Sequence, residues 1–151
     1  MSDDEIYRKY CADLVTFATG LVGPVDAADV VSGAVARVLA SPTWPTARNP
    51  RAYLFRSVLN ESRMHHRSTM RRRAREARVA QREAIEDQEL RPEVLEAVAR
   101  LSVRQRAVVV LTYWHDLHER ETADLLGISV GTVRRHLARA HQKLRGVIDD
   151  D

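Results

Sequence analysis

The chain has 151 residues, of which 44% are hydrophobic, 30% are charged and only 5% are aromatic. This length allows one ordinary domain or two small ones, and the balance of residue types favours helical bundles over a sheet sandwich. No apolar run approaches the length of a membrane span, and the first residues lack the basic and apolar segments of a signal peptide. We therefore expect a cytoplasmic protein with no membrane partner. The single cysteine excludes an internal disulfide framework.

The charge is unevenly distributed, although the net charge is only +3. Residues 63–82 hold eight arginines and one acid, and residues 130–145 hold five Lys or Arg and no acid. Residues 83–96, between them, hold six acids and one base. This pattern predicts two anion-binding surfaces joined by a linker with another role. The alternatives are solvated helix faces for the basic runs and a solvated arm for the acidic one.

Apolar residues at helical spacing predict two helices in the first 40 residues. The first is expected over residues 3–22, with Gly20, Gly23 and Pro24 ending it. Asp26 is expected to cap the second. The predicted buried stripe of the second helix consists of Val30, Val31, Ala34, Val35 and Val38.

A third helix is predicted after an irregular loop at residues 41–49. Asn49 and Pro50 are expected to be its N-cap and first residue. Its apolar face consists of Leu54, Phe55, Val58 and Leu59. Beyond Asn60 arginines replace the apolar residues, and we expect this basic rod to lie on something negatively charged.

The second half predicts three further helices. Ser102 and Gln105 fit a capping box at the start of the first, whose stripe consists of Ala107, Val110, Leu111 and Trp114. The second is expected over residues 119–126, with Gly127 in a left-handed turn and Ser129 capping the third. The core positions of the third are Val133, Leu137, Ala140 and Leu144.

Residues 122–137, TADLLGISVGTVRRHL, are typical of a helix-turn-helix. Ala123 is small where the helices cross, Gly127 makes the tight turn, and Ile128 and Val133 fix the angle of the second helix. This geometry places the start of that helix in the major groove of DNA, where arginine can pair with guanine. The alternative is a helical hairpin used for protein contact.

Two other classes of protein compete with this interpretation. A regulator of the response-regulator output type has a similar helix-turn-helix, but the first 80 residues lack the strand-helix alternation of a receiver domain. An enzyme is disfavoured because His115 and His118 lack ligand partners, and no phosphate-binding glycine loop or nucleophile-base pair is present. We therefore expect no catalytic residue, metal, cofactor or small-molecule substrate.

Residues 101–114, LSVRQRAVVVLTYW, the helix-turn-helix and LARAHQKLR at 137–145 together resemble the C-terminal domain of extracytoplasmic-function (ECF) sigma factors. DAADVV at 26–31 resembles the polymerase-binding helix of that family, and NPRAYLFRSVLN at 49–60 resembles its promoter −10 helix. The resemblance implies an all-α fold of two small helical domains. These are a sigma region 2-like domain at 1–80 and a sigma region 4-like domain at 98–151, joined by an acidic linker at 81–97.

The resemblance also implies a function and its residues. The chain is expected to bring core RNA polymerase to promoters by recognising their −10 and −35 elements, and an anti-sigma factor is a further expected partner. The residues implied for −35 DNA are Thr132, Arg134, Arg135, His136 and Arg139. Those implied for −10 DNA are Trp44, Arg48, Asn49, Arg56, Asn60, Arg63 and Arg67. Those implied for the clamp helices of the largest polymerase subunit are Asp29, Ser32 and Arg37.

The −10 site is predicted to be a pocket for one extruded base, made by the loop at 42–49 and Asn60. Trp44 either supplies a ring for stacking or packs against the bundle. Ser32, followed by Gly33, replaces the glutamine usual in the family, and this pair weakens helix propensity in the polymerase-binding helix. A degenerate, sigma-like regulator therefore remains an alternative. Arg135 replaces a usually small residue, so the −35 sequence is expected to differ from that of relatives.

Overall fold

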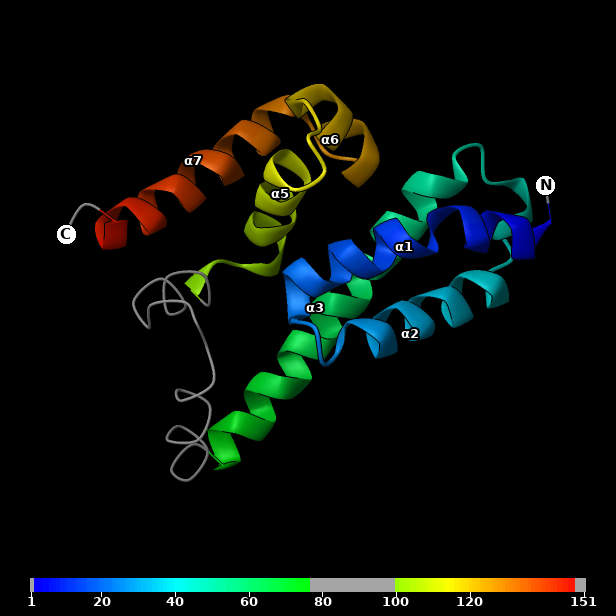
Figure 1. Ribbon diagram of the computed structural model, residues 1–151, viewed down its shortest axis with the longest axis horizontal. Coiled ribbons are helices and arrows are strands. Elements are labelled where there is room, and N and C mark those ends of the chain that lie inside the picture. Colours follow the sequence, from blue (N-terminus) through cyan, green and yellow to red (C-terminus); the bar gives the residue numbers. More distant parts are fainter. Residues whose placement is uncertain (1, 77–99, 149–151) are drawn as a thin grey trace.

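The computed structural model describes residues 2–76 and 100–148, and in these ranges the secondary structure is entirely helical (Figure 1). This confirms the all-α prediction for the described part of the chain. The predicted acidic linker at 81–97 lies outside the described residues. Within them, no single helix is long and apolar enough to cross a membrane. The helices α1 (Asp3–Val22) and α2 (Ala27–Ala40) meet that test only as a pair bent by 120°.

The first half is a bundle of α1 (Asp3–Val22), α2 (Ala27–Ala40) and α3 (Pro50–Glu76). Ser2 caps α1 by accepting a hydrogen bond from the Glu5 N–H at 3.2 Å, and Gly23 ends it with φ of 89°. The predicted stripe of α2 is buried except for Val35, which is half-buried. The prediction for Asp26 is only partly right. It stands at the N-cap position, but its side chain makes no capping bond and instead contacts His65 Nε2 at 3.2 Å.

A 3-10 turn, η1 (Trp44–Thr46), lies in the loop that leads to α3. Asn49 caps α3 as predicted, because its Oδ1 accepts a hydrogen bond from the Ala52 N–H at 3.1 Å. Four apolar residues then turn into the bundle, and all four are buried: Leu54, Phe55, Val58 and Leu59. The helix continues beyond this core as the expected basic rod (Figure 1).

The second half consists of α5 (Val103–Tyr113), α6 (Glu119–Leu126) and α7 (Val130–Ile148). Both bonds of the predicted capping box are present, joining Ser102 and Gln105 at 3.1 Å each. The prediction for Trp114 is wrong. It follows the last turn of α5 as the C-cap and is 72% exposed, because the chain leaves the helix there and turns its ring away from the core.

The two halves share one hydrophobic core within the described residues. Helix α5 packs on α1, and α6 packs on α3. At the junction the His115 ring stands edge-on to Phe17 and Phe55, with centroids 6.2 and 6.0 Å away. The predicted division into two domains stays a prediction, since both of its boundaries fall outside the described residues.

Candidate nucleic-acid interface

The start of α7 is held rigidly by its own sequence. Gly127 has φ of 69°, in the left-handed region that glycine adopts without a Cβ penalty. The Ile128 N–H then donates to the Ala123 carbonyl at 3.0 Å, and Ser129 Oγ accepts from the Thr132 N–H at 3.0 Å. Ala123 and Val133 are buried between α6 and α7. These contacts fix the angle between the two helices, as a helix-turn-helix requires.

Helix α7 presents a basic face beyond this corner. Arg134, Arg135 and Arg139 are exposed, whereas Thr132 and His136 are half-buried. Burial lowers the pKa of His136 from 6.5, and the nearby charges of Arg104, Arg139 and Arg135 lower it further. His136 is therefore a neutral ring at neutral pH, able to donate and accept hydrogen bonds.

Arg134 is engaged by an acid of the neighbouring helix. Its Nε and Nη2 donate to the two carboxylate oxygens of Glu119 at 2.9 and 2.6 Å. This hydrogen-bonded pair lowers the pKa of Glu119 and raises the pKa of Arg134. Arg134 must leave Glu119 before it can contact a base, whereas no ion pair within the described residues holds Arg135.

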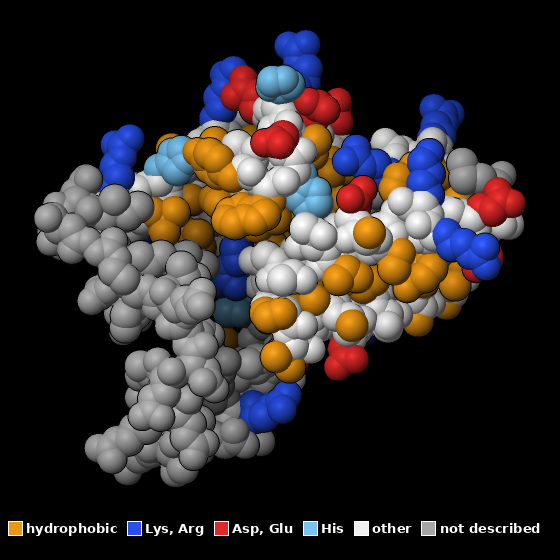
Figure 2. Space-filling view, viewed as in Figure 1, with side chains coloured by type: hydrophobic (Ala, Val, Ile, Leu, Met, Phe, Trp, Pro, Cys, Tyr) orange, Lys and Arg blue, Asp and Glu red, His pale blue; other side chains and the backbone are white. Residues whose placement is uncertain are grey.

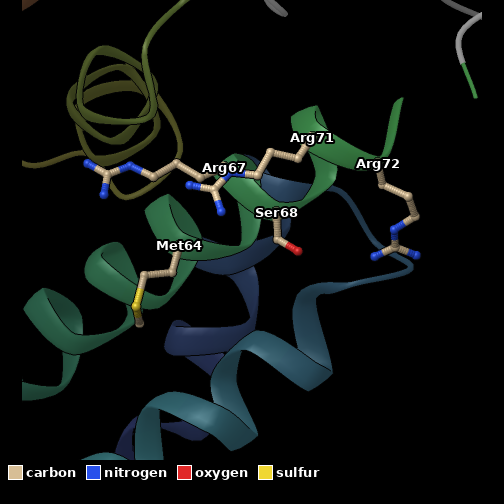
Figure 3. Close-up of a pocket in the computed structure, with 5 residues that line it drawn as sticks. All are labelled: Met64, Arg67, Ser68, Arg71 and Arg72. Atoms are coloured by element: carbon tan, nitrogen blue, oxygen red, sulfur yellow. The ribbon is translucent and has the colours of Figure 1, made fainter. Parts of the chain in front are cut away.

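The basic rod of α3 carries a second cationic surface (Figure 3). An open groove of about 510 Å³ is lined by Met64, Arg67, Ser68, Arg71 and Arg72. In Figure 3 the guanidinium group of Arg72 lies apart from those of Arg67 and Arg71. Charges spread along a helix suit a row of phosphates better than one small anion.

The loop before α3 is pinned by Tyr53. The Tyr53 hydroxyl hydrogen-bonds with Ser41 Oγ and Thr43 Oγ1, each at 2.7 Å, and these bonds, that with Ser41 first, lower its pKa. Trp44 is only 7% exposed, and its Nε1 donates to Asp3 Oδ1 at 2.9 Å. Of the two roles considered for Trp44, the structure shows the packed one. The sequence analysis did not predict the role of Tyr53 in holding the loop.

Residues predicted for the two promoter elements meet at one cavity between the halves. Its volume is about 190 Å³ and it is lined by Arg56, Leu59, Asn60, Arg104, Leu126, Ile128, Thr132 and His136. Arg56 and Asn60 were assigned to the −10 element, and Thr132 and His136 to the −35 element. Two other predicted −10 residues, Arg48 and Asn49, are exposed at the opposite end of the α3 core. The structure therefore places Arg48 and Asn49 apart from Arg56 and Asn60.

Arg56 is bound to the helix-turn-helix itself. Its Nε donates to the Leu125 carbonyl at 3.1 Å and its Nη2 donates to the Asp124 carbonyl at 2.8 Å. These carbonyls belong to the last turn of α6, where intrahelical partners are lacking and the helix dipole favours a cation. Arg63 lies further toward the C-terminal end of α3 and is half-buried. Its pKa is lowered by burial and by the charges of Arg104 and Arg67.

The residues predicted to dock on polymerase lie on α2. Asp29, Ser32 and Arg37 are exposed, and Arg37 Nε contacts Glu61 Oε2 at 3.1 Å. A Cβ on Gly33 would lie 2.9 Å from Glu61 Oε1. Gly33 therefore leaves room for the carboxylate that pairs with Arg37, which gives a physical reason for a glycine in this helix.

A metal centre finds no support in the part of the chain that the structure describes. No group of three or more His, Cys, Asp or Glu side chains is placed there to hold an ion. Of the two histidines considered as ligands from sequence, His115 packs against Phe17 and Phe55 of the shared core, and His118 is exposed at the N-cap of α6.

Comparison with known proteins assigns the family. Residues 91–144 match the model for Sigma-70, region 4. The RNA polymerase sigma-E factor of Streptomyces antibioticus is 34% identical over 152 residues, covering 94% of this chain and 82% of the relative. That of Streptomyces coelicolor is 34% identical over 131 residues, covering 81% and 71%.

Two solved structures share the fold. The sigma factor RpoE of Bartonella quintana, solved with the anti-sigma factor NepR, has a TM-score of 0.63 at 23% identity over 98% of this chain and 97% of that one. CnrH, solved with the cytosolic domain of CnrY, has a TM-score of 0.64 at 24% identity, covering 98% and 88%. Together with the sequence relatives, these matches show that the chain belongs to the sigma-70 family of RNA polymerase sigma factors, in its ECF group, and that it acts in directing transcription initiation.

Proposed function

We propose that this sigma factor binds core RNA polymerase through α2 and selects promoters with two separate surfaces. The first half reads the −10 element and the second half reads the −35 element. The observation that carries the proposal is the start of α7, where a corner fixed by Gly127 and Ser129 presents an acid-free, exposed basic face.

For the −35 element, the first turns of α7 enter the major groove. Arg135 and Arg139 are exposed and ready to contact DNA, and Arg134 joins them by exchanging Glu119 for a base or phosphate. Arginine can donate two hydrogen bonds to guanine O6 and N7, which no other base accepts in the same geometry. Thr132 and the neutral ring of His136 add contacts at the edge of this surface.

For the −10 element, the exposed arginines of α3 follow the phosphates while Asn60 reads one unstacked base. An asparagine amide donates and accepts at once, which suits the edge of a base. Arg48 and Asn49, exposed in the loop that Tyr53 pins, are assigned further contacts with the melted strand. Because Trp44 is packed into the bundle, base capture relies on hydrogen bonds and not on stacking upon its ring.

Partners follow from the same family membership. Asp29, Ser32 and Arg37 form the polymerase-docking face of α2. An anti-sigma factor binds the chain, as NepR binds RpoE of Bartonella quintana. We infer that the protein acts in the cytoplasm, where polymerase and DNA are found, and that it contributes binding energy and no chemistry of its own.

The test is transcription by sigma-free core polymerase on a library of promoter fragments, with and without the chain. The proposal expects transcripts that start at defined sites only when the chain is present. A regulator of the response-regulator type would bind DNA yet give no transcript, and a degenerate sigma-like protein would bind core polymerase yet give none. Either result would contradict the proposal.

A further inference from the structure

The cavity of about 190 Å³ that residues of α3, α5, α6 and α7 line has a composition that favours anions. Its ionisable side chains are Arg56, Arg104 and His136, and no carboxylate lies among the described residues that line it. Asn60 and Thr132 add an amide and a hydroxyl, both of which can donate hydrogen bonds. Figure 2 shows basic and histidine side chains in the recess between the second half, at the top, and the first half.

Like charges crowd around Arg104. After the larger effect of burial, its charge lowers the pKa of Arg63 on α3 and the pKa of His136 on α7. Arg104 is therefore close to ionisable groups of two other helices. In the part of the chain that the structure describes, no ion pair neutralises Arg63 or Arg104. Repulsion between unpaired cations opposes folding, and a bound anion would relieve it.

Arg56 has hydrogen-bond donors to spare at the same place. Its Nε and Nη2 donate to the carbonyls of Leu125 and Asp124, at 3.1 and 2.8 Å. A guanidinium group has more N–H donors than these two bonds use, so further donors of Arg56 are available. Both partners are neutral carbonyls, so no acid cancels the charge. The group is also closely packed, since a Cβ on Gly127 would lie 2.9 Å from Arg56 Cζ.

The size of the cavity selects the kind of anion. A volume of about 190 Å³ far exceeds that needed for one water molecule and suits a phosphate or diphosphate group. A DNA duplex is too wide to enter it. Charged donors from separate helices match the several acceptor oxygens of a phosphate. Leu59, Leu126 and Ile128 complete the lining and exclude water from part of it, which strengthens charge interactions inside.

We propose that this cavity is a binding site for a small phosphate-bearing ligand, held chiefly by Arg56 and Arg104. The polar side chains of Asn60 and Thr132 and the ring of His136 complete the site. The inference goes beyond the proposed function and does not depend on it, because it concerns the free chain and needs neither polymerase nor promoter. A failed transcription test would therefore leave it untouched.

Inorganic diphosphate is the probe, titrated into the full chain by isothermal titration calorimetry at a fixed ionic strength of about 0.15 M. We expect the parent to bind it. Arg104→Gln should weaken the binding about tenfold or more, since a hydrogen bond to a charged group contributes that much. Arg120→Gln is the matched control, because Arg120 is exposed on α6 and does not line the cavity. It should leave the affinity nearly unchanged, since salt screens a charge outside the site.

Nitrogen NMR of the histidine rings locates the ligand. Diphosphate should shift the ring resonances of His136 and leave those of His118, exposed at the start of α6, unchanged. The same concentration should have no effect on His136 in Arg104→Gln. That variant should stay folded, because it removes a charge that repels Arg63 and His136, and circular dichroism checks this.

The site is wrong if the parent binds no diphosphate at millimolar concentration, or if binding leaves the His136 resonances unchanged. Equal weakening in Arg104→Gln and Arg120→Gln would show diffuse attraction to a basic protein and would also overturn it. A duplex of random sequence distinguishes a phosphate carried by DNA. Arg104→Gln should leave the affinity for this duplex nearly unchanged. A loss as large as that on diphosphate would assign these arginines to the DNA backbone and contradict a small-ligand site.

Discussion

The two DNA-reading surfaces proposed for this chain are built in different ways. The −35 surface arises from one contiguous stretch, in which Gly127, Ser129 and Val133 shape the corner that presents the arginines of α7. The −10 surface is assembled from separate segments, with Asn60 on α3 and a loop held by Tyr53. The difference shows why a helix-turn-helix can be predicted from sequence. For a pocket made by tertiary contacts, sequence predicts candidate residues but not which of them meet.

The arginines of the two surfaces are also restrained differently. Arg134 is held by Glu119 within its own half, so its release is a local exchange of partners. Arg56 is held by carbonyls of the other half, so its release requires the halves to separate. This contrast requires the two halves to depend on one another for stability.

The largest effect is expected from Phe55→Ala. Phe55 is fully buried and contacts both Phe17 and His115, with ring centroids 5.0 and 6.0 Å away. Its truncation should lower the free energy of unfolding by about 3–5 kcal/mol. Denaturant unfolding is followed by the fluorescence of Trp44 in one single-tryptophan variant and of Trp114 in another.

Both tryptophans should report the same destabilised transition, because the core is shared. A Trp114 transition that Phe55→Ala leaves unchanged would show that the second half is stable by itself. The control is Leu39→Ala, whose side chain is 51% exposed and whose truncation should change the free energy of unfolding by about 0.5 kcal/mol or less.

An intermediate effect is expected at the −35 surface. Arg135→Ala should weaken binding to a recovered promoter about 5- to 150-fold and relax base preference at one position. Glu119→Gln should have the opposite sign, because it frees Arg134 from a charged partner. Filter binding to a set of single-base variants measures both. Uniform weakening across all sequences would show that Arg135 contacts only phosphate.

The smallest effect is expected from His115→Phe. Burial lowers the pKa of His115 below 6.5, so the unfolded chain takes up a proton first as the pH falls. The free energy of unfolding of the parent should therefore decrease from about pH 6.5 downward and level off below the folded pKa. His115→Phe keeps an aromatic ring beside Phe17 and Phe55 and should reduce this slope, leaving the part that His136 contributes. An unchanged slope, equal to that of the exposed control His118→Phe, would contradict this account of the junction.

Local signals predicted most of the fold. Caps such as Asn49 and Ser102 and the turn at Gly127 act on neighbouring residues, so the starts of α3 and α5 and the end of α6 follow directly from sequence. Asp26 failed as a side-chain cap because His65, 39 positions away, contacts its carboxylate. Trp114 failed because apolar spacing does not reveal the residue at which a helix ends.

The functional surfaces were predicted as residue types and not as contacts. Nothing in the apolar spacing distinguishes Arg56, which binds the end of α6, from the arginines that remain exposed on α3. The prediction that Gly20 helps to end the first helix is wrong, because Gly20 lies within α1. A Cβ there would lie 2.5 Å from Val110 Cγ2, so this glycine serves the packing of α1 on α5 and not a turn. Contacts between the halves depend on the folded arrangement, which local patterns do not encode.

The central claim is that two distant surfaces read two separate promoter elements, and one measurement tests it most directly. A promoter library randomised at both the −35 and −10 regions is transcribed by core polymerase with the parent chain, Arg135→Ala or Asn60→Ala, and the transcribed templates are sequenced. The parent should select two blocks of preferred bases. Arg135→Ala should lose preference only in the −35 block, and Asn60→Ala only in the −10 block, with core polymerase still bound. If either variant relaxes both blocks together, or if neither changes its own block, the assignment of one surface to each element is wrong.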